Sequence, residues 1–265
     1  MSTIGFIGGG RVTRILVGGW LRAGSFPHTL RVAEPDDAAF SALARGSSAV
    51  ERVALERAAG ADLVMLALHP PQIGAVLPRL AAVLPPGATL LSLAPKITLE
   101  QLSAGARTAR VARMIPNAPS LVGRGYNPVT FGPGLDESAR TTIATLFAPL
   151  GSIPQVPESH LEAYAILSGM GPTYFWPQFE ALREVAGQLG LPAGQAAAGL
   201  RATIEGTIAT LLDAGLTPAE VMDLVPVKPL GDHEAAIVAM YHDRLPALHA
   251  KIAPAPALAT TQQQG

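Results

Sequence analysis

The sequence predicts a doubly wound α/β domain in residues 1–157, followed by an all-helical domain in residues 158–252. In the first region, short apolar runs alternate with segments of helical length, which is typical of a parallel sheet covered by helices on both faces. Three consecutive glycines directly follow the first apolar run. In the second region the apolar residues keep a helical period, and no convincing strand is found.

The composition is that of a folded protein and excludes several classes of function. Of 265 residues, 49% are hydrophobic and 15% are charged, which is too apolar for intrinsic disorder. Lys and Arg total 19 against 20 for Asp and Glu, so there is no basic field to attract nucleic acid. The absence of cysteine excludes disulfides and thiolate chemistry. No apolar stretch is long enough to span a membrane, and we expect a cytoplasmic protein.

The elements of the first domain are predicted from the period of their apolar residues. Residues 4–7 form a short apolar run, and residues 12–21 carry apolar side chains on one helical face. Further strands are expected at 30–33, 62–68, 88–93, 110–114 and 128–131, and further helices at 71–84 and 136–147.

The second domain is expected to contain helices at 172–189, 193–214, 218–224 and 232–251. Gly190 and Gly215 stand where glycines end helices, and Thr217 with Glu220 forms a capping box. The apolar side chains of this region exceed what a small domain buries alone, so we expect a homodimer or a larger homo-oligomer. Residues 253–265 have no apolar face and are expected to form a tail.

The glycine run is typical of a dinucleotide-binding turn of the Rossmann type. Gly8 permits the tight turn after the first strand, and Gly10 lets the backbone approach a pyrophosphate. Arg11 and Val12 then open the first helix, whose N-terminus offers N–H donors to the phosphates, with the Arg11 side chain as a further contact. The order of strand, turn and helix favours a dinucleotide cofactor over a glycine turn that binds nothing.

Glu34, at the end of the second predicted strand, is the expected contact of the adenosine ribose. A carboxylate at this place accepts hydrogen bonds from the ribose hydroxyls and repels the 2′-phosphate of NADPH. Asp36 and Asp37 add negative charge, and the next cation along the chain is Arg45. These residues favour NADH. The alternative is that the acids only begin the next helix, where aspartate is common.

Three further segments resemble motifs of the pyrroline-5-carboxylate reductase family. They are residues 67–72 (Ala-Leu-His-Pro-Pro-Gln), 114–119 (Met-Ile-Pro-Asn-Ala-Pro) and 167–174 (Leu-Ser-Gly-Met-Gly-Pro-Thr-Tyr). With the glycine turn, they cover nearly the whole chain in the family's order. The resemblance implies an NAD(P)H-dependent reductase of a small cyclic imine such as pyrroline-5-carboxylate, as in proline biosynthesis, with a helical domain through which subunits dimerise.

The resemblance also implies which residues form the site. His69, Pro70 and Asn117 would line the coenzyme pocket, and all three follow predicted strands at the edge where open α/β sheets bind ligands. The proton for the imine nitrogen would come from a hydroxyl group or from water. Three hydroxyl-bearing residues are the expected donors: Ser168, Thr173 and Tyr174.

One segment departs from the family pattern. The family's Ser-Pro-Gly-Gly-Thr-Thr loop, which binds the substrate carboxylate and the imine nitrogen, corresponds to residues 228–233, Lys-Pro-Leu-Gly-Asp-His. Leu230 replaces a glycine, and Asp232 and His233 replace both threonines. We therefore expect weak turnover of pyrroline-5-carboxylate and preference for a different imine.

Two other functions stay open at this point. A dinucleotide-binding protein without catalysis, serving as a sensor or partner subunit, is suggested by the altered loop. A relative of the hydroxyacid dehydrogenases would need a lysine after the second glycine motif, where this chain has Pro-Thr-Tyr-Phe at 172–175. No metal site is expected, because Ile237 stands where a His-Glu-x-x-His pattern beginning at His233 needs its second histidine.

Overall fold

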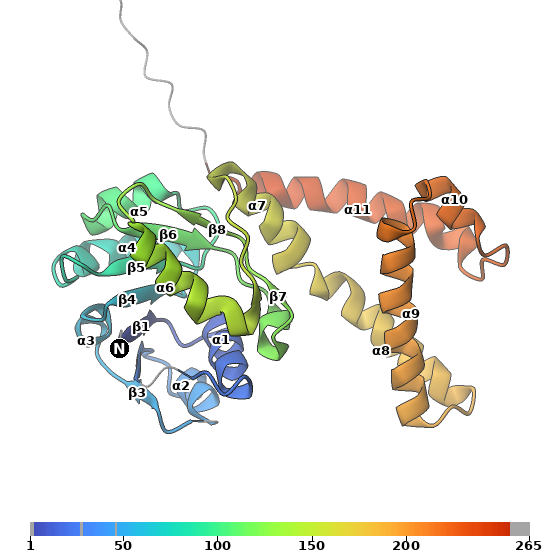
Figure 1. The fold of residues 1–265 in the computed structure, drawn as a ribbon, viewed down its shortest axis with the longest axis horizontal. Coiled ribbons are helices and arrows are strands. Elements are labelled where there is room, and N and C mark those ends of the chain that lie inside the picture. The colour runs from blue at the N-terminus through green and yellow to red at the C-terminus, as the bar shows by residue number, and fades with distance from the viewer. Residues whose placement is uncertain (1–2, 27–28, 46, 255–265) are drawn as a thin grey trace, which may run out of the picture. The chain divides into compact units, whose positions relative to one another are not determined.

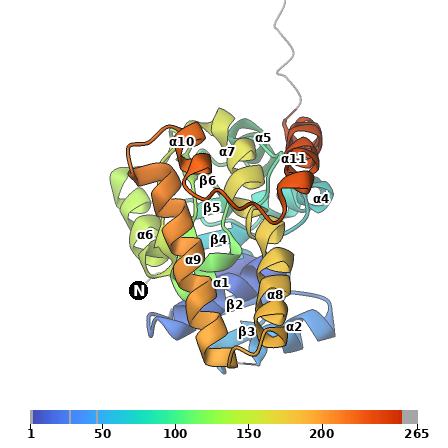
Figure 2. The same cartoon turned by 90° about the vertical axis from the view of Figure 1, so that its right-hand side faces the viewer.

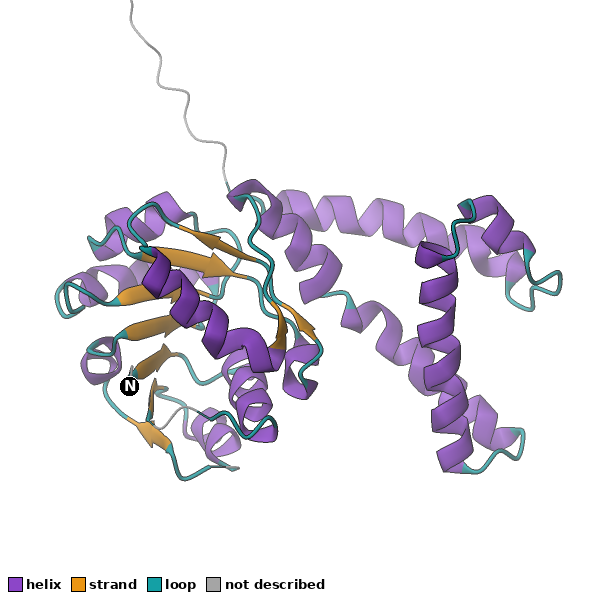
Figure 3. Cartoon of the chain, in the orientation of Figure 1, coloured by secondary structure: helices purple, strands orange, loops and turns teal. Residues whose placement is uncertain are grey.

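The computed structural model describes residues 3–26, 29–45 and 47–254, which form two compact units. One unit consists of residues 1–170 and 248–265, and the other of residues 171–247. In the described part of the chain, every strand belongs to the first unit (Figure 3). The domain boundary after residue 157 stays a prediction, and residues 255–265 of the expected tail lie outside the described residues.

A seven-stranded sheet forms the centre of the first unit (Figure 1). All neighbouring strands are parallel except the last two, and the strand order reverses direction at β1 and β4. In spatial order the strands are β3 (Val50–Arg52), β2 (Leu30–Ala33), β1 (Ile4–Ile7), β4 (Leu63–Leu66), β5 (Thr89–Ser92), β6 (Val111–Met114) and β8 (Val129–Phe131). The carboxyl ends of β1 and β4 therefore border the crevice where such sheets bind nucleotides.

Helices cover both faces of this sheet, as the unbroken apolar runs predict. Leu63 and Met65 of β4 pack into one cluster, and Val64 and Leu66 pack into the other, because successive side chains of a strand point to opposite faces. The first cluster includes α1 (Arg11–Arg22), α2 (Asp37–Ala44) and α6 (Glu137–Phe147). The second includes α3 (Leu55–Ala59), α4 (Pro70–Ala81) and α5 (Leu99–Ala106).

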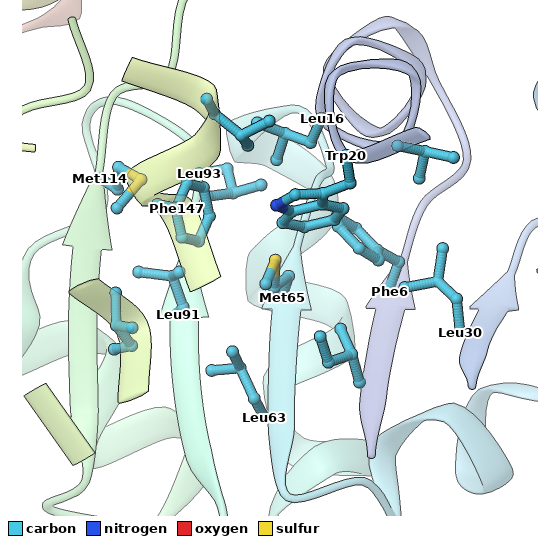
Figure 4. Packing of buried hydrophobic residues seen from close by; sticks show 14 of the residues in the cluster. Phe6, Leu16, Trp20, Leu30, Leu63, Met65, Leu91, Leu93, Met114 and Phe147 are labelled. Carbon is cyan, nitrogen blue, oxygen red and sulfur yellow. The ribbon is translucent and has the colours of Figure 1, made fainter. Parts of the chain in front are cut away.

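Trp20 is the largest fully buried side chain of the first cluster (Figure 4). Its indole ring lies edge-on to Phe6 and Phe147, with centroid distances of 6.3 and 5.8 Å. The indole N–H donates to the Leu146 carbonyl at 2.8 Å. Because its polar atom has this partner, the tryptophan is buried without an unsatisfied donor.

Short elements complete the first unit. These are η1 (Ala118–Val122), β7 (Gly125–Tyr126), η2 (Ala148–Leu150), β9 (Gly151–Ser152), η3 (Glu158–His160), α7 (Leu161–Tyr164) and a single π-helical turn, η4 (Ala165–Gly169). After the second unit the chain returns, and Ile252 packs against the cluster of Ile115, Leu161 and Ala165.

The second unit is entirely helical in the part that the structure describes (Figure 2). Gly190 and Gly215 have φ angles of 88° and 71°, as expected of residues that end helices, and the Thr217 capping box is formed. The helices are α8 (Pro172–Gln188), α9 (Ala193–Asp213), α10 (Pro218–Asp223) and α11 (Gly231–Ile252), whose last turns belong to the first unit. No helix among the described residues is long and apolar enough to cross a membrane.

Several elements were not predicted from the sequence, among them β3, α2, α3, α5, α7 and the two-residue strands β7 and β9. Strand β3 has three residues and α3 has five, too few to show a period. Helix α2 begins at an aspartate cap and buries only Leu43, so its apolar face is narrow.

Candidate coenzyme and imine site

The glycine turn has the geometry of a nucleotide-binding turn. Gly8 has a φ of 106°, and a Cβ atom there would lie 2.5 Å from the Ala67 carbonyl oxygen, so another side chain would not fit. A Cβ atom at Gly10 would meet nothing within 4 Å. Thr13, which replaces the usual third glycine, is buried and donates its hydroxyl to the Gly8 carbonyl at 2.7 Å. This hydrogen bond therefore joins the first turn of α1 to the start of the glycine turn.

The N-terminus of α1 faces an open cavity of about 600 Å³. The cap residue of α1 is Gly10, which has no side chain to cap the helix, and the first turn contains no acidic residue. The N–H donors of this first turn are therefore available to a phosphate. Arg11, Arg14 and His69 line the same cavity, and the two arginines make it electropositive. These features fit the pyrophosphate of a dinucleotide.

Glu34 lies directly beside the glycine turn. Its carboxylate accepts the Gly9 N–H at 2.8 Å through one oxygen and the Asp36 N–H at 2.8 Å through the other. In Rossmann-type sheets, an acidic residue at the end of the second strand is the usual contact of the adenosine ribose. Asp36 caps α2 by accepting the Ala39 N–H, as the alternative interpretation of the acids expects, whereas the Glu34 carboxylate faces the glycine turn.

Arg52 is a site residue that the sequence did not reveal. From the end of β3 it donates to the carbonyls of Glu34 and Pro35, at 2.8 and 2.7 Å, and pairs with Asp37. Its guanidinium also lies over the Phe40 ring. Arg45 is the next cation after the acids along the sequence, but the pairing of β2 with β3 places Arg52 against them.

A second cavity, of about 480 Å³, adjoins Glu34 at the carboxyl ends of β1 and β2. Apolar side chains form most of its wall, among them Ile7, Val53, Leu68 and Val76. Such a lining suits a flat heterocycle, and its place beside Glu34 fits the adenine of the coenzyme.

His69 and Pro70 begin α4 at the carboxyl end of β4. His69 is the cap residue, and its N–H is accepted by the Gln72 side chain at 3.3 Å. Both residues line the 600 Å³ cavity, next to Ala94 and Pro95 from the end of β5. The structure thus brings His69, Pro70, Gly10, Arg11 and Val12 around one cavity.

Asn117 is 8% exposed and holds neighbouring segments together. Its Oδ1 accepts the Tyr126 N–H at 3.1 Å, and its Nδ2 donates to the Ser168 carbonyl at 3.2 Å. The backbone N–H of Asn117 donates to Asn127, whose side chain is completely buried. Asn117 therefore links the end of β6 to the π-helical turn.

Ser168 lies in that π-helical turn, and its hydroxyl donates to the Tyr164 carbonyl at 2.9 Å. Tyr164 also contacts Tyr126, with ring centroids 5.7 Å apart. A hydrogen bond between the two hydroxyls raises the pKa of Tyr126, with burial as a smaller cause. Turns of this π type are frequent at functional sites.

Arg113, on β6, is completely buried between two carboxylates, Glu158 and Glu162. Glu158 also accepts the Leu99 N–H at 2.7 Å, and Glu162 accepts the Lys96 N–H at 2.9 Å. This cluster fixes the loop between β5 and α5, one strand away from His69.

Thr173 and Tyr174 belong to the second unit, in the first turn of α8. The Tyr174 ring lies edge-on to Tyr241, with centroids 5.9 Å apart. Burial, and secondarily the charge of Tyr241, raises the pKa of Tyr174. The hydroxyl of Tyr174 is therefore a weaker acid than that of an exposed tyrosine.

The altered segment 228–233 begins helix α11. Asp232 and Glu234 lie in its first turn, and Leu230 is 67% exposed. Asp232 at this position is stabilised by the helix dipole. Within the described ranges, no three His, Asp or Glu side chains come together as metal ligands.

The sheet, the glycine turn and the carboxylate beside it define the class: a dinucleotide-dependent oxidoreductase. Residues 3–96 match a family model described as NADP oxidoreductase, coenzyme F420-dependent. Residues 158–261 match the model described as pyrroline-5-carboxylate reductase dimerisation. The pyrroline-5-carboxylate reductase of Corynebacterium melassecola is 31% identical over 248 residues, which cover 89% of each chain.

The chain belongs to the pyrroline-5-carboxylate reductase family and is an NAD(P)H-dependent oxidoreductase. A solved pyrroline-5-carboxylate reductase from Coxiella burnetii is 28% identical, with a TM-score of 0.66 and coverage of 95% of this chain and 94% of that one. The Plasmodium falciparum pyrroline carboxylate reductase, solved with NADP bound, shares the fold at 19% identity, with a TM-score of 0.71 and the same coverage.

Proposed function

We propose that this chain reduces the C=N bond of a small cyclic imine and prefers NADH to NADPH. The observation that carries the proposal is the Glu34 carboxylate, fixed on the Gly9 N–H beside the nucleotide-binding turn. In a chain of this family, that carboxylate stands against the adenosine ribose and disfavours a 2′-phosphate. The matched dimerisation region supports a homo-oligomer as the active form.

When bound, NAD(P)H would supply the hydride for reduction of the imine carbon. The chain's own groups would bind and orient the coenzyme: the N-terminus of α1 and Arg11 would hold the pyrophosphate, and Glu34 would hold the ribose. The imine nitrogen then takes a proton, for which Tyr174, Thr173 and Ser168 are the proposed donors or hold a donating water. Tyr174 carries a phenol hydroxyl that can donate a proton, although burial raises its pKa and makes it a weaker acid than an exposed tyrosine.

The coenzyme preference is tested by titrating the protein with NADH and NADPH. NADH should bind about 10- to 100-fold more tightly, the range of a hydrogen bond to a charged group. Replacing Glu34→Ser together with Pro35→Arg should reverse the order, while Arg52 keeps its bond to the residue 35 carbonyl. Glu51→Gln, which removes an acid that does not contact Gly9, is the control. Equal or tighter binding of NADPH by the unchanged protein contradicts the preference.

The substrate is tested with a panel of cyclic imines and NADH oxidation as the readout. Pyrroline-5-carboxylate should be a weak substrate, because Leu230 adds bulk and Asp232 adds negative charge to the segment that takes the place of the family's substrate loop. Restoring Gly at 230 and Thr at 232 and 233 should raise its turnover. A kcat/KM for pyrroline-5-carboxylate of about 10⁴ M⁻¹s⁻¹ or more in the unchanged protein would show that this interpretation of the loop is wrong.

A dinucleotide-binding protein without catalysis is the second candidate, and the altered segment 228–233 is what favours it. Such a protein should bind NADH and oxidise it with no imine of the panel. The cytoplasmic location and the lack of nucleic-acid binding stay predictions from the sequence.

A further inference from the structure

Lys96 has a backbone conformation that lysine rarely adopts. Its φ is 76°, and the other non-glycine residue with positive φ in the described ranges is Arg107. Arg107 ends helix α5, where a left-handed residue is ordinary. Lys96 ends no helix, because it follows strand β5 and precedes α5. Backbone strain of this kind is concentrated at functional sites.

Buried charges hold Lys96 in this conformation. Its N–H donates at 2.9 Å to Glu162, which is 2% exposed and paired with the completely buried Arg113. Its side chain, in contrast, is exposed, and the ion pairs found among the described residues do not include its ammonium group. A glycine would adopt the same φ without strain, so what lysine adds at this position is its charged side chain.

Lys96 directly follows three residues of a cavity wall, Leu93, Ala94 and Pro95. Pro95, immediately before it, lines the 600 Å³ cavity together with Arg11 and His69. Strand β5 lies between β4 and β6, on the side of the sheet away from Glu34 and the adenosine cavity. A dinucleotide bound across the strand-order reversal places its nicotinamide on this side. His69 and Lys96 are the ionisable residues that follow the central strands β4 and β5 here.

We propose that Lys96 binds an anionic group of the substrate, a carboxylate, beside the reactive ring of the coenzyme. This inference rests on the proposed function, because it takes the substrate to be a cyclic imine, here one that carries a carboxylate. A lysine ammonium is a compact charge on a flexible stem, so it attracts an anion without requiring one fixed geometry. Lys96 thus provides a carboxylate contact that does not depend on residues 228–233.

The kinetic experiment compares 1-pyrroline-2-carboxylate with 2-methyl-1-pyrroline, which differ in charge at one position. Lys96→Met should raise the KM of the carboxylate at least about tenfold and leave the KM values of the neutral imine and NADH unchanged. Lys96→Arg keeps the charge and should recover most of the affinity. Lys251→Met removes another exposed lysine of the same unit and should change none of these values. Equal changes for both imines, or no change, overturn the proposal.

A binding measurement separates this inference from the proposed reduction. The NADH-loaded protein is titrated in a calorimeter with pyrrole-2-carboxylate, an aromatic anion whose binding requires no turnover. Lys96→Met should bind it at least about tenfold more weakly than the unchanged protein. Lys96→Gly should raise Tm by removing the strain and should still lose the affinity.

The outcomes differ for the two proposals. If no imine is reduced but the binding difference is found, imine reduction is wrong and the Lys96 assignment stands. If the unchanged protein does not bind pyrrole-2-carboxylate, or if Lys96→Gly keeps its affinity, the assignment is wrong whatever the turnover.

Discussion

The two units of this chain bury their apolar residues to very different extents. In the first unit, two clusters of completely or nearly completely buried side chains enclose the sheet. In the second, Ala196 is the one hydrophobic residue with less than a tenth of its surface exposed, among those described. Large apolar side chains of the second unit are exposed to solvent, among them Trp176, Leu189, Ile208, Leu212 and Val227.

This difference indicates where each unit obtains its stability. The first unit is stabilised by its own core, since its apolar side chains lie between its own sheet and helices. The helices of the second unit present more apolar surface than a lone soluble unit normally exposes, which marks an interface with another subunit. The match to a dimerisation family over residues 158–261 agrees with this conclusion.

The largest expected effect is the loss of the oligomer. Ile208 and Leu212 of α9 are 54% and 72% exposed, so replacing both by Glu leaves the single chain's core intact and places two charges in the expected interface. Light scattering at micromolar concentration should then give the mass of a monomer. Ala104→Glu, on an exposed position of α5, should leave the mass unchanged. A monomeric mass for the unchanged protein would contradict the conclusion that the exposed apolar side chains of the second unit form an interface.

The next effect distinguishes the two tryptophans of the chain. Trp20→Ala removes a completely buried ring and should lower the free energy of unfolding by about 3–5 kcal/mol. The loss should be the same at every protein concentration, because all its contacts lie within the first unit. Trp176→Ala, 52% exposed on α8, should instead change how stability depends on concentration. Urea denaturation at two concentrations provides both values. Equal losses for the two variants in dilute protein would contradict separate sources of stability.

The smallest effect uses a matched pair of helix caps. Thr98 and Thr217 each form a capping box, with Gln101 on α5 and with Glu220 on α10. Replacing either threonine by Ala should cost about 1 kcal/mol, measured by hydrogen exchange of the first-turn amides.

The two capping boxes should differ in how their stability responds to acid. The Thr217 N–H and hydroxyl donate to Glu220 and lower its pKa below the ordinary 4.5. The contribution of Glu220 is therefore complete above pH 4.5 and is lost as the pH falls through the lowered pKa. Gln101 does not titrate, so the Thr98 N–H that it accepts should keep its protection as the pH falls, whereas the Thr217 N–H should lose protection. Equal acid sensitivity of these two N–H groups would show that Glu220 is not the cause.

Much of the fold and part of the site were predictable from the sequence, because they depend on local patterns. The apolar runs of β1 and β4 and the glycine turn are continuous in sequence, and the structure places Glu34 against Gly9 of that turn. Arg52 was missed because it reaches Glu34 only through strand pairing, in which Arg52 lies opposite Val32.

Two other site features depend on contacts between distant residues. Asn117 donates to the carbonyl of Ser168, which is 51 positions away in the sequence. Glu162 accepts the N–H of Lys96, which is 66 positions away. No local period or motif encodes such pairs, because they form only when separate elements have packed. The sequence therefore reveals the nucleotide turn but not what fixes the loops on the other side of the sheet.

The return of the chain to the first unit affects how the protein is made. Ile252 packs against Ile115, Leu161 and Ala165, yet residues 171–247 are synthesised between these partners. At about 5–20 residues per second, the ribosome needs roughly 4–15 s to produce that stretch. During this interval the sheet can form, while the small cluster around Ile115 lacks its last member. A nascent chain that is released early therefore has a folded nucleotide-binding half with an apolar site uncovered, which a chaperone or protease can recognise.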